Sequence, residues 1–402
     1  MSPDRAAQLA DLYRRTLLDD VMPFWLRHGV DQEHGGFLTA LDRDGTVIDT
    51  DKSVWFQGRG AWTFASLCLD YEDRPEWRAA AESGVRFLRE RCRGPGGKLY
   101  FTVTREGRPL RMRRYVFSES FAAIACAAVH KLTGDARARD EALQYFNTYL
   151  HHSFTPGRMP PKTDQETRPA TGIGSLMIGI ATAQELRKHL GDVSVMDQTM
   201  TQWIDFAIER IEGLFMKPEH QALMEVVAPD GQILDHFDGR TLNPGHAIEC
   251  AWFLMDEGRH RGDPRLIRVG ATILEWMWER GWDKQYGGIF YFRDLRELPV
   301  HEYWHDMKFW WPHNEAIIAT LMAWKLTGDP KYAQWHQQVH DWSFQHFPDS
   351  QHGEWYGYLH RDGSVSSSLK GNMWKGPFHL PRMLMVCHQL LDGPLTGTSG
   401  AL

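Results

Sequence analysis

The sequence predicts an all-α fold, an (α/α)6 barrel of six helical hairpins with short β-hairpins at one mouth. Three observations lead to it: a recurring helix–turn–helix plan, Gly-Asp pairs that end apolar helices, and abundant tryptophan. Glycine commonly follows the last residue of a helix. The pairs lie 57, 71 and 66 residues apart, close to one sixth of the 402-residue chain, which indicates a repeated two-helix unit. They are Gly134-Asp135, Gly191-Asp192, Gly262-Asp263 and Gly328-Asp329.

Each repeat begins with an amphipathic helix and continues through a turn or hairpin into a more apolar helix. The turn segments combine glycine with alternating aromatic or β-branched residues, which is typical of a small β-hairpin. They are HGGFLTALDRDG (34–45), GPGGKLYFTVTREG (94–107), HQALMEVVAPDG (220–231), YGGIFYFRD (286–294) and HGEWYGYLHRDG (352–363).

Six such units can bury their apolar faces by closing into a ring, with the second helix of each pair inside. The alternative is an open α-solenoid, which uses shorter units and does not need a tryptophan-rich interior. Because no Pro/Ser-rich linker interrupts the series, we expect a single catalytic domain over residues 1–391. The segment 392–402, DGPLTGTSGAL, is predicted to be a disordered tail.

Composition narrows the class of protein. The formal net charge of −7 argues against a nucleic-acid partner, which favours a basic surface. Five widely spaced cysteines without a CxxC motif indicate neither a disulfide framework nor a thiolate zinc site. The charged first twenty residues do not resemble a signal peptide, and no run is apolar enough for a membrane span. We therefore expect a cytoplasmic protein with no membrane partner.

Aromatic residues are unusually frequent: 17 Trp, 12 Tyr and 20 Phe in 402 residues. They can simply fill a large core. They can also line a concave site, in which indole faces pack against sugar rings.

Polar residues interrupt the apolar sequence at one place in each repeat, the start of the inner helix. His246, His313 and His379 follow one another at 67 and 66 residues, one repeat each. Equivalent positions of a closed ring face the same mouth, so we expect these side chains to converge on one cavity. A lone histidine in a helix is more often a core residue, and the repetition favours a site. The set comprises Arg59, Ser118, Glu119, Thr171, His246, Glu249, Trp310, Trp311, His313, Glu315, His379 and Arg382.

Other site chemistries are less well supported. His246 and Glu249 are i, i+3 neighbours and could form half of a metal site, but di-metal bundles use the order Glu-x-x-His with a matching partner motif. Glycoside hydrolysis needs a carboxylate pair, and Glu119, Glu249 and Glu315 form no obvious one. We therefore predict no metal and no required cofactor.

Two imidazoles across a cavity suggest a reaction class. A base on one face of a carbon acid and an acid on the other can remove a proton and return it to the opposite face. This inverts a stereocentre or moves a carbonyl group. Arg59 could stabilise the enediolate that develops, and Trp310 and Trp311 could form the wall against the sugar.

These residues carry a resemblance to the N-acylglucosamine 2-epimerase family, (α/α)6-barrel sugar epimerases and isomerases. It extends along nearly the whole chain, through DQEHGGFLTALDRDG, WFQGR, FSESF, NPGHAIEC, KFWWPHNEA, GEWYGYLHRDG and WKGPFHLPR. It implies that His246 and His379 are the two bases at C2, that Arg59, Glu249 and Glu315 support them, and that Trp310 stacks on the ring. Further substrate-binding candidates in these strings are Trp311, His313, Ser118, Glu119, Asn243, Trp374 and Arg382.

The resemblance also guides the substrate prediction. The cellobiose epimerase and aldose–ketose isomerase branches have a histidine at the start of the third inner helix, where this chain has TGIGSLMIG (171–179). The sequence there is similar to the N-acetylglucosamine branch, although Pro377, Gly172 and Gly174 depart from it. We expect interconversion of N-acyl-D-glucosamine and N-acyl-D-mannosamine, with Met177 and Leu176 near the acyl group. Asn243 or Thr171 is the predicted partner of the amide.

Several alternatives stay open at this stage. The enzyme could act on unsubstituted hexoses such as mannose and glucose, as a 2-epimerase or an aldose–ketose isomerase. A non-enzymatic sugar-binding or protein-interaction barrel would keep the aromatic cavity without the chemistry. By resemblance alone, ATP is a candidate effector, and helical barrels of this kind suggest a homodimer that contacts through outer helices.

Overall fold

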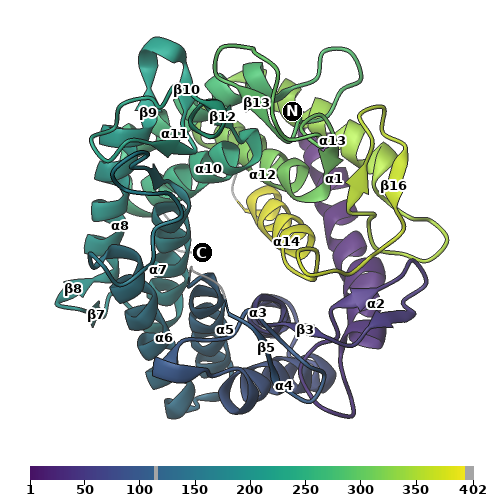
Figure 1. The fold of residues 1–402 in the computed structure, drawn as a ribbon. Helices are drawn as coiled ribbons and strands as arrows, with labels where there is room; N and C mark the ends of the chain where they lie inside the picture. The colour runs from purple at the N-terminus through teal and green to yellow at the C-terminus, as the bar shows by residue number, and fades with distance from the viewer. Residues whose placement is uncertain (113–115, 394–402) are drawn as a thin grey trace.

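The computed structural model describes residues 1–112 and 116–393, which form a closed double ring of helices (Figure 1). The predicted tail lies largely outside the described residues; of it, Asp392 is the last residue of a helix and Gly393 follows it. The inner ring consists of α3 (Val54–Asp70), α5 (Phe117–Thr133), α7 (Gly174–Leu190), α10 (Pro244–Arg261), α12 (Trp310–Thr327) and α14 (His379–Asp392).

The outer ring contributes one helical segment before each inner helix. The first is α1 (Pro3–Arg15), which continues through η1 (Thr16–Val21), α2 (Met22–Phe24) and η2 (Trp25–Gly29). The others are α4 (Pro75–Arg91), α6 (Ala136–Phe154), α8 (Met200–Arg210) with η4 (Ile211–Phe215), α11 (Pro264–Gly281) and α13 (Pro330–His346). The predicted (α/α)6 barrel of six hairpins is confirmed.

Composition explains which helices lie inside. The α5 segment FSESFAAIACAAVH is buried almost throughout, because small alanines let α3 and α7 approach it from both sides. Outer helices such as α4 bury one stripe and expose arginines and glutamates on the other face. The ring closes where α14 meets α3: the Thr63 hydroxyl donates to the Pro377 carbonyl at 2.6 Å, and the Tyr71 hydroxyl is 3.1 Å from His388 Nδ1.

Short connections lie at one end of the barrel, as the Gly-Asp pairs predict. Gly134, Gly262 and Gly328 cap α5, α10 and α12 in the left-handed conformation, which glycine adopts without strain. The aspartates that follow them accept a backbone hydrogen bond at the start of the next outer helix. Each turn therefore ends one helix and begins the next within two residues.

Longer connections with short strands lie at the other end, the mouth. The strands pair antiparallel as β1 (Ala40–Leu41) with β2 (Val47–Asp49), and β9 (Met216–Lys217) with β10 (Ala222–Leu223). A further hairpin, β7 (Ser194–Val195) with β8 (Gln198–Thr199), lies at the opposite end, between α7 and α8. Two three-stranded sheets are β3 (Lys52–Ser53), β4 (Thr102–Val103), β5 (Pro109–Arg111), and β14 (Lys308–Phe309), β15 (Tyr358–Leu359), β16 (Val365–Ser367). Two pairs join different repeats: β6 (Thr171–Gly172) with β11 (Val226–Val227), and β12 (Thr241–Leu242) with β13 (Arg293–Asp294).

Pairing between repeats corrects part of the sequence prediction. The segment 286–294 was expected to form its own hairpin, but its strand β13 pairs with β12 of the preceding repeat. In the same way β3 and β14 pair with strands of neighbouring repeats. The alternating pattern identifies strands, whereas their partners depend on how the ring brings repeats together.

Buried ion pairs tie neighbouring connections together around part of the mouth. Asp283 accepts from Lys308 Nζ at 3.1 Å and from Arg361 Nε at 2.8 Å. Asp31 pairs in the same way with Lys52 and Arg105, and Asp349 pairs with Lys370 and Arg43. In each case the lysine is fully buried and the arginine comes from the hairpin turn of another repeat. We call these three groups the Arg–Asp–Lys ties.

None of the helices in the described ranges combines the length and the apolar character that crossing a membrane requires.

Candidate active site

A cavity of about 1950 Å³ occupies the centre of the ring, and its lining extends from the mouth to the far ends of the inner helices. All six inner helices contribute to its wall, together with residues of the strand-bearing connections. One lining residue from each inner helix, in chain order, is Arg59, Phe121, Met177, His246, Trp311 and His379. Of the residues predicted to converge on one cavity, seven line it: Arg59, His246, Glu249, Trp310, Trp311, His379 and Arg382.

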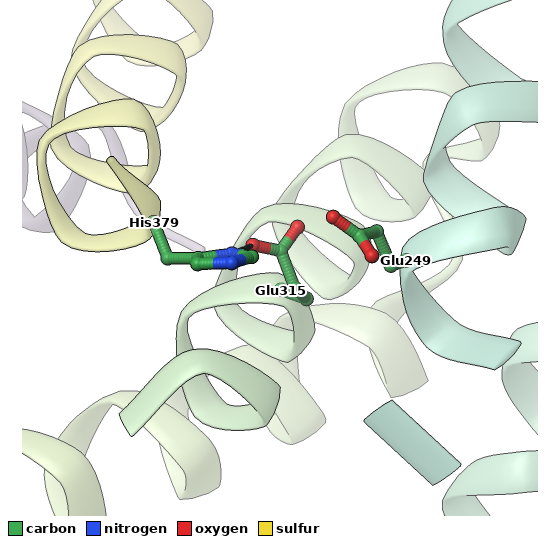
Figure 2. Close-up of side chains that lie close together, drawn as sticks. All are labelled: Glu249, Glu315 and His379. Carbon is green, nitrogen blue, oxygen red and sulfur yellow. Dashed lines mark hydrogen bonds and ion pairs between the residues drawn. The ribbon is translucent and has the colours of Figure 1, made fainter. Parts of the chain in front are cut away.

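His379, the first residue of α14, points across the wall of the cavity toward α12 (Figure 2). Its Nδ1 is 2.8 Å from Glu315 Oε1. A carboxylate at Nδ1 requires a proton on that nitrogen, which leaves Nε2 as the basic nitrogen of the neutral ring. Glu315 is itself buried and accepts a second hydrogen bond from Trp252 Nε1 at 2.7 Å. The imidazole is thus held in one tautomer and one orientation.

Arg382 joins Glu315 to Glu249 one turn further along α14. Its guanidinium donates to Glu249 Oε1 at 2.5 Å and to Glu315 Oε1 at 2.7 Å. Glu249, Glu315 and His379 also offer ligand atoms within 4.8 Å of one another, a spacing that suits a metal ion. Both carboxylates, however, already face the Arg382 cation, so the protein supplies the positive charge at this position itself.

His246 lies in the first turn of α10 and is paired with a residue that the sequence analysis missed. Its Nδ1 is 3.0 and 3.1 Å from the two carboxylate oxygens of Glu225. Glu225 lies between β10 and β11, and its backbone carbonyl accepts from the Ile173 amide at 3.1 Å. The His246 side chain remains 38% exposed, enough for its other nitrogen to meet a ligand in the cavity.

The two histidines differ electrostatically. Burial, reinforced by the charges of Arg382 and Arg59, holds the pKa of His379 well below its usual range. Burial also disfavours a charged His246, but the ion pair with Glu225 and the charges of Glu249 and Glu315 outweigh it and raise the pKa of His246. The two shifts are opposite in direction, so His246 holds a proton more readily than His379 does.

Arg59 lies on α3 among aromatic rings. Its guanidinium is 4.2 Å from the ring centroid of Phe121 and 4.9 Å from that of Phe378. Burial lowers its pKa to about 9, which still leaves it charged at neutral pH. One nitrogen donates to the Trp374 carbonyl at 3.3 Å, while the buried Nε has no hydrogen-bond partner among the residues that the structure describes. The cation is therefore available to an anionic oxygen in the cavity.

Three tryptophans predicted to bind substrate line the cavity. The ring of Trp311 lies 5.0 Å from that of His246 and 5.8 Å from that of His379, so it packs against both imidazoles. Trp310 stands almost perpendicular to His379 at 6.1 Å and to Tyr358 at 5.4 Å. Trp374 is 42% exposed and lies at the mouth.

His313 corrects the prediction that all three repeated histidines reach the cavity. It is fully buried between helices α12 and α13, where its ring stacks on Trp342. Nδ1 donates to the Phe309 carbonyl at 2.6 Å, and Nε2 accepts from the Ile289 amide at 2.9 Å. Because both nitrogens are bonded to backbone, His313 positions the connection before α12 and cannot contact a sugar in this arrangement.

Other predicted substrate-binding residues also lie behind the cavity wall. Ser118 donates to the Tyr100 carbonyl, and Glu119 accepts from the Leu99 amide at 2.7 Å. Burial raises the pKa of Glu119 to about 7. Asn243 caps α10 by accepting from the His246 amide at 3.1 Å. These three side chains anchor the first turns of inner helices and do not line the cavity. Thr171 and Leu176 do not line it either.

Sequence reasoning missed Glu225, which contacts His246 from behind, and several cavity-lining residues on the connections between helices. Glu225 carried one usable signal, because it is the only charged residue in the apolar run ALMEVVA (222–228). The cavity-lining residues could not be found from a repeated spacing in the sequence, since they lie on irregular segments whose course depends on the closed ring. They are Tyr291, Trp304, Phe309, Tyr358 and Asn372.

The geometry thus combines two histidine–glutamate pairs, two buried arginines and aromatic walls in one cavity, which is suited to proton transfer on a sugar. A family model described as N-acylglucosamine 2-epimerase (GlcNAc 2-epimerase) matches residues 35–379. The chain belongs to this family.

Relatives of established activity agree with that assignment. The chain is 37% identical to N-acylglucosamine 2-epimerase of Mus musculus over 388 residues, covering 94% of this chain and 91% of the relative. It is 26% identical to cellobiose 2-epimerase of Bacteroides fragilis, covering 94% and 97%. The chain is therefore a carbohydrate epimerase, a sugar 2-epimerase of the isomerase class.

Solved structures share the fold. The cellobiose 2-epimerase from Bacillus thermoamylovorans matches with a TM-score of 0.82 at 19% identity, covering 96% of this chain and 99% of that one. A D-mannose isomerase matches with a TM-score of 0.78 at 18% identity, covering 96% and 97%.

Proposed function

We propose that the enzyme interconverts N-acyl-D-glucosamine and N-acyl-D-mannosamine by deprotonation and reprotonation at C2. The observation that carries the proposal is the pair of histidines on one cavity, each oriented by a glutamate and both in contact with Trp311. The similarity to mammalian N-acylglucosamine 2-epimerases over 94% of the chain supports the substrate class.

The reaction begins with the ring-opened sugar, whose C1 aldehyde acidifies the proton at C2. His379 Nε2 takes that proton, and the electrons of the C2–H bond form a C1–C2 double bond while the C1 oxygen becomes anionic. His246 then donates a proton to the opposite face of C2, and the C1 carbonyl re-forms. The net change is inversion at C2, with one proton gained and one lost by the protein.

Cations next to the two histidines stabilise the anionic intermediate. Arg59 is held by aromatic rings, lines the cavity, and has a buried Nε that no other described residue hydrogen-bonds. A guanidinium in a site of low dielectric stabilises a developing oxyanion more than it would in water. We assign Arg59 to the C1 oxygen, and Arg382 to the orientation of Glu315 and Glu249.

The acyl group fits the apolar part of the wall formed by α5 and α7. Phe117, Phe121, Met177 and Ile178 line this part of the cavity. Burial of one methyl group contributes about 1 kcal/mol, whereas a buried amide needs a hydrogen-bond partner. Asn243 and Thr171, our sequence-based candidates for that partner, do not line the cavity.

A second candidate function is 2-epimerisation or aldose–ketose isomerisation of unsubstituted sugars. The cavity of about 1950 Å³ leaves room for a sugar larger than one monosaccharide, such as cellobiose, and its size does not distinguish mannose or glucose from the N-acylated hexosamines. The lining runs from Trp374 at the mouth to Lys325 and Gln389 near the far ends of the inner helices.

An activity panel followed by NMR distinguishes these functions, with N-acetylglucosamine, N-acetylmannosamine, mannose, glucose and cellobiose as substrates. We expect the N-acylated sugars to exceed the others in kcat/KM by at least about 10-fold, the discrimination of one buried group. Equal or faster turnover of mannose or cellobiose would contradict the proposal and favour the second function.

We further propose a homodimer in the cytoplasm that needs no cofactor, since the reaction transfers only protons. Activity after exhaustive dialysis against a chelator tests the cofactor requirement, and sedimentation equilibrium tests the dimer. ATP as an effector rests on the family resemblance alone, and titration of the activity with ATP tests it.

A further inference from the structure

The two histidine–glutamate pairs are not equivalent, because only one of the glutamates is shared with a cation. Glu315 faces His379, Arg382 and the Trp252 indole at the same time. Glu225, in contrast, has both carboxylate oxygens on His246 Nδ1, and His246 is its ion-pair partner among the described residues. The negative charge of Glu225 therefore acts mainly on one imidazole.

Groups from several elements face His246. Glu225 approaches from the connection between β10 and β11, Glu249 lies on the same helix, and Glu315 approaches from α12. His379, whose charge is coupled to that of His246, and Arg382 beside it come from α14. Tyr291 packs edge-on against Trp311, and burial together with the charge of Glu225 raises the pKa of its hydroxyl. Of these three carboxylates, Glu249 and Glu315 are also paired with Arg382.

We propose that Glu225 is a positioning residue that keeps His246 protonated, so that the resting enzyme has a single proton arrangement with His246 as acid and His379 as base. This inference rests on the proposed function. Glu225 is well placed for it because its own backbone is fixed: the Ile173 amide at the start of the third inner helix donates to the Glu225 carbonyl.

The proton balance gives Glu225 a second role. One turnover moves a proton from C2 to His379 Nε2 and another from His246 Nε2 to C2. The free enzyme then has a neutral His246 and a protonated His379. Before the next turnover in the same direction, His379 releases its proton to water and His246 takes one from water. Glu225 favours this return, because its carboxylate stabilises the protonated His246.

The proposal predicts a specific pH dependence. Catalysis needs one proton on the histidine pair, so kcat/KM reaches its plateau between the ionisation of His379 and that of His246. Both directions share this plateau, since their ratio is the equilibrium constant of the reaction. Replacing Glu225 by a neutral residue of the same shape should lower the pKa of His246. The kcat/KM plateau should then end at a lower pH on its alkaline side and begin at the same pH on its acid side.

The test compares Glu225→Gln with two controls, Glu225→Asp and Glu302→Gln. Glu302 lies on the connection before β14 and its removal deletes the same charge near the mouth. We expect the alkaline limb of kcat/KM to move down by about one pH unit or more in Glu225→Gln, the effect of an opposite charge within 4–6 Å. The acid limb should stay in place, Glu225→Asp should largely restore the alkaline limb, and Glu302→Gln should match the wild type.

A uniform loss of kcat/KM in Glu225→Gln with an unmoved alkaline limb would overturn the proposal, because a purely structural role has that signature. The protonation state of His246 is also measured directly by ¹⁵N NMR of the imidazoles, assigned with His246→Asn. We expect His246 to be doubly protonated at pH 7 in the wild type and neutral in Glu225→Gln. A neutral His246 in the wild type would refute the proposal even if the enzyme epimerises, whereas absent epimerisation with a protonated His246 would refute only the proposed function.

Discussion

At the scale of single residues, the site depends on giving two identical side chains different properties. Burial next to Arg382 and Arg59 holds the pKa of His379 well below its usual range, whereas the contact with Glu225 helps to raise the pKa of His246. The carboxylate at each Nδ1 also directs the other nitrogen to the ligand. Charge and orientation therefore come from the neighbours of the two rings.

The first prediction concerns these two rings. Asparagine keeps a polar amide near each glutamate but cannot transfer the proton, so His246→Asn and His379→Asn should each lower kcat by at least about 100-fold. Turnover assays on the purified variants check this, with circular dichroism as a control for folding. Near-normal turnover in either variant would show that the residue is not one of the two bases.

The second prediction concerns His313, which has the repeat spacing of a catalytic residue but a different environment. His313→Leu removes the acceptor for the buried Ile289 amide, which should cost about 1–3 kcal/mol of unfolding free energy. The kcat of the folded variant should stay within about threefold of the wild type, since surface and core changes away from the reacting atoms act on stability. Urea denaturation and turnover assays measure the two effects, and a loss similar to that of His246→Asn would contradict the placement of His313.

The spacing of the three histidines correctly predicted that they lie at the same end of the barrel, but it did not predict which face of its helix each one occupies. His246 is the third residue of its helix, His313 the fourth and His379 the first. Successive residues of an α-helix are about 100° apart, so equal spacing along the chain does not determine which face of its helix each histidine occupies. A repeat length of 67 and then 66 residues does not reveal where each helix begins. Glu225 was missed because it lies on a strand connection outside that repeated position.

At the scale of elements, the Arg–Asp–Lys ties connect the hairpins that carry the mouth. Their arginines precede the turn glycines in RDG (43–45), REG (105–107) and RDG (361–363). The corresponding turn of the fourth repeat has Pro229 before Asp230, and a proline cannot form the ion pair. The motif thus predicted the turns from sequence, whereas the ties needed the closed ring to bring different repeats together.

The third prediction tests one tie. Asp283→Asn leaves Lys308 buried without its counter-charge, and breaking a buried ion pair in this way costs about 3 kcal/mol or more. Asp230→Asn, in the exposed turn without a tie, is the matched control and should change stability by less than about 0.5 kcal/mol. Urea denaturation at pH 7 measures both variants. Equal midpoints would show that the ties contribute nothing to the fold.

At the scale of the whole molecule, closure of the ring brings the starts of all six inner helices to one mouth and buries polar groups between the two layers. His336 and His340 of α13 lie against Tyr13 of α1, with the Tyr13 hydroxyl 2.9 Å from His340 Nδ1. Burial lowers the pKa of His336 to about 4 and that of His340 to about 3. Burial also lowers the pKa of His313 to about 3.

The fourth prediction is a loss of stability in mild acid. Below about pH 6.5 the unfolded chain protonates these histidines while the folded chain does not, so the free energy of unfolding falls as pH falls toward 4. Each histidine contributes up to about 1.4 kcal/mol per pH unit in that interval. Urea denaturation at pH 7.5, 6.0 and 5.0 should show this slope, and it should decrease in His336→Gln/His340→Gln. An unchanged slope in the double variant would contradict the assignment.

The most direct test of the whole account is turnover of N-acetyl-D-mannosamine in D2O, followed by ¹H NMR. If two histidines that exchange protons with water invert C2, the N-acetyl-D-glucosamine that forms must contain deuterium at C2 from the first turnovers. Its C2 proton signal should therefore be missing while its other signals grow. Product that keeps the C2 proton would contradict transfer between two opposed histidines, and the absence of this product would contradict the proposed substrate.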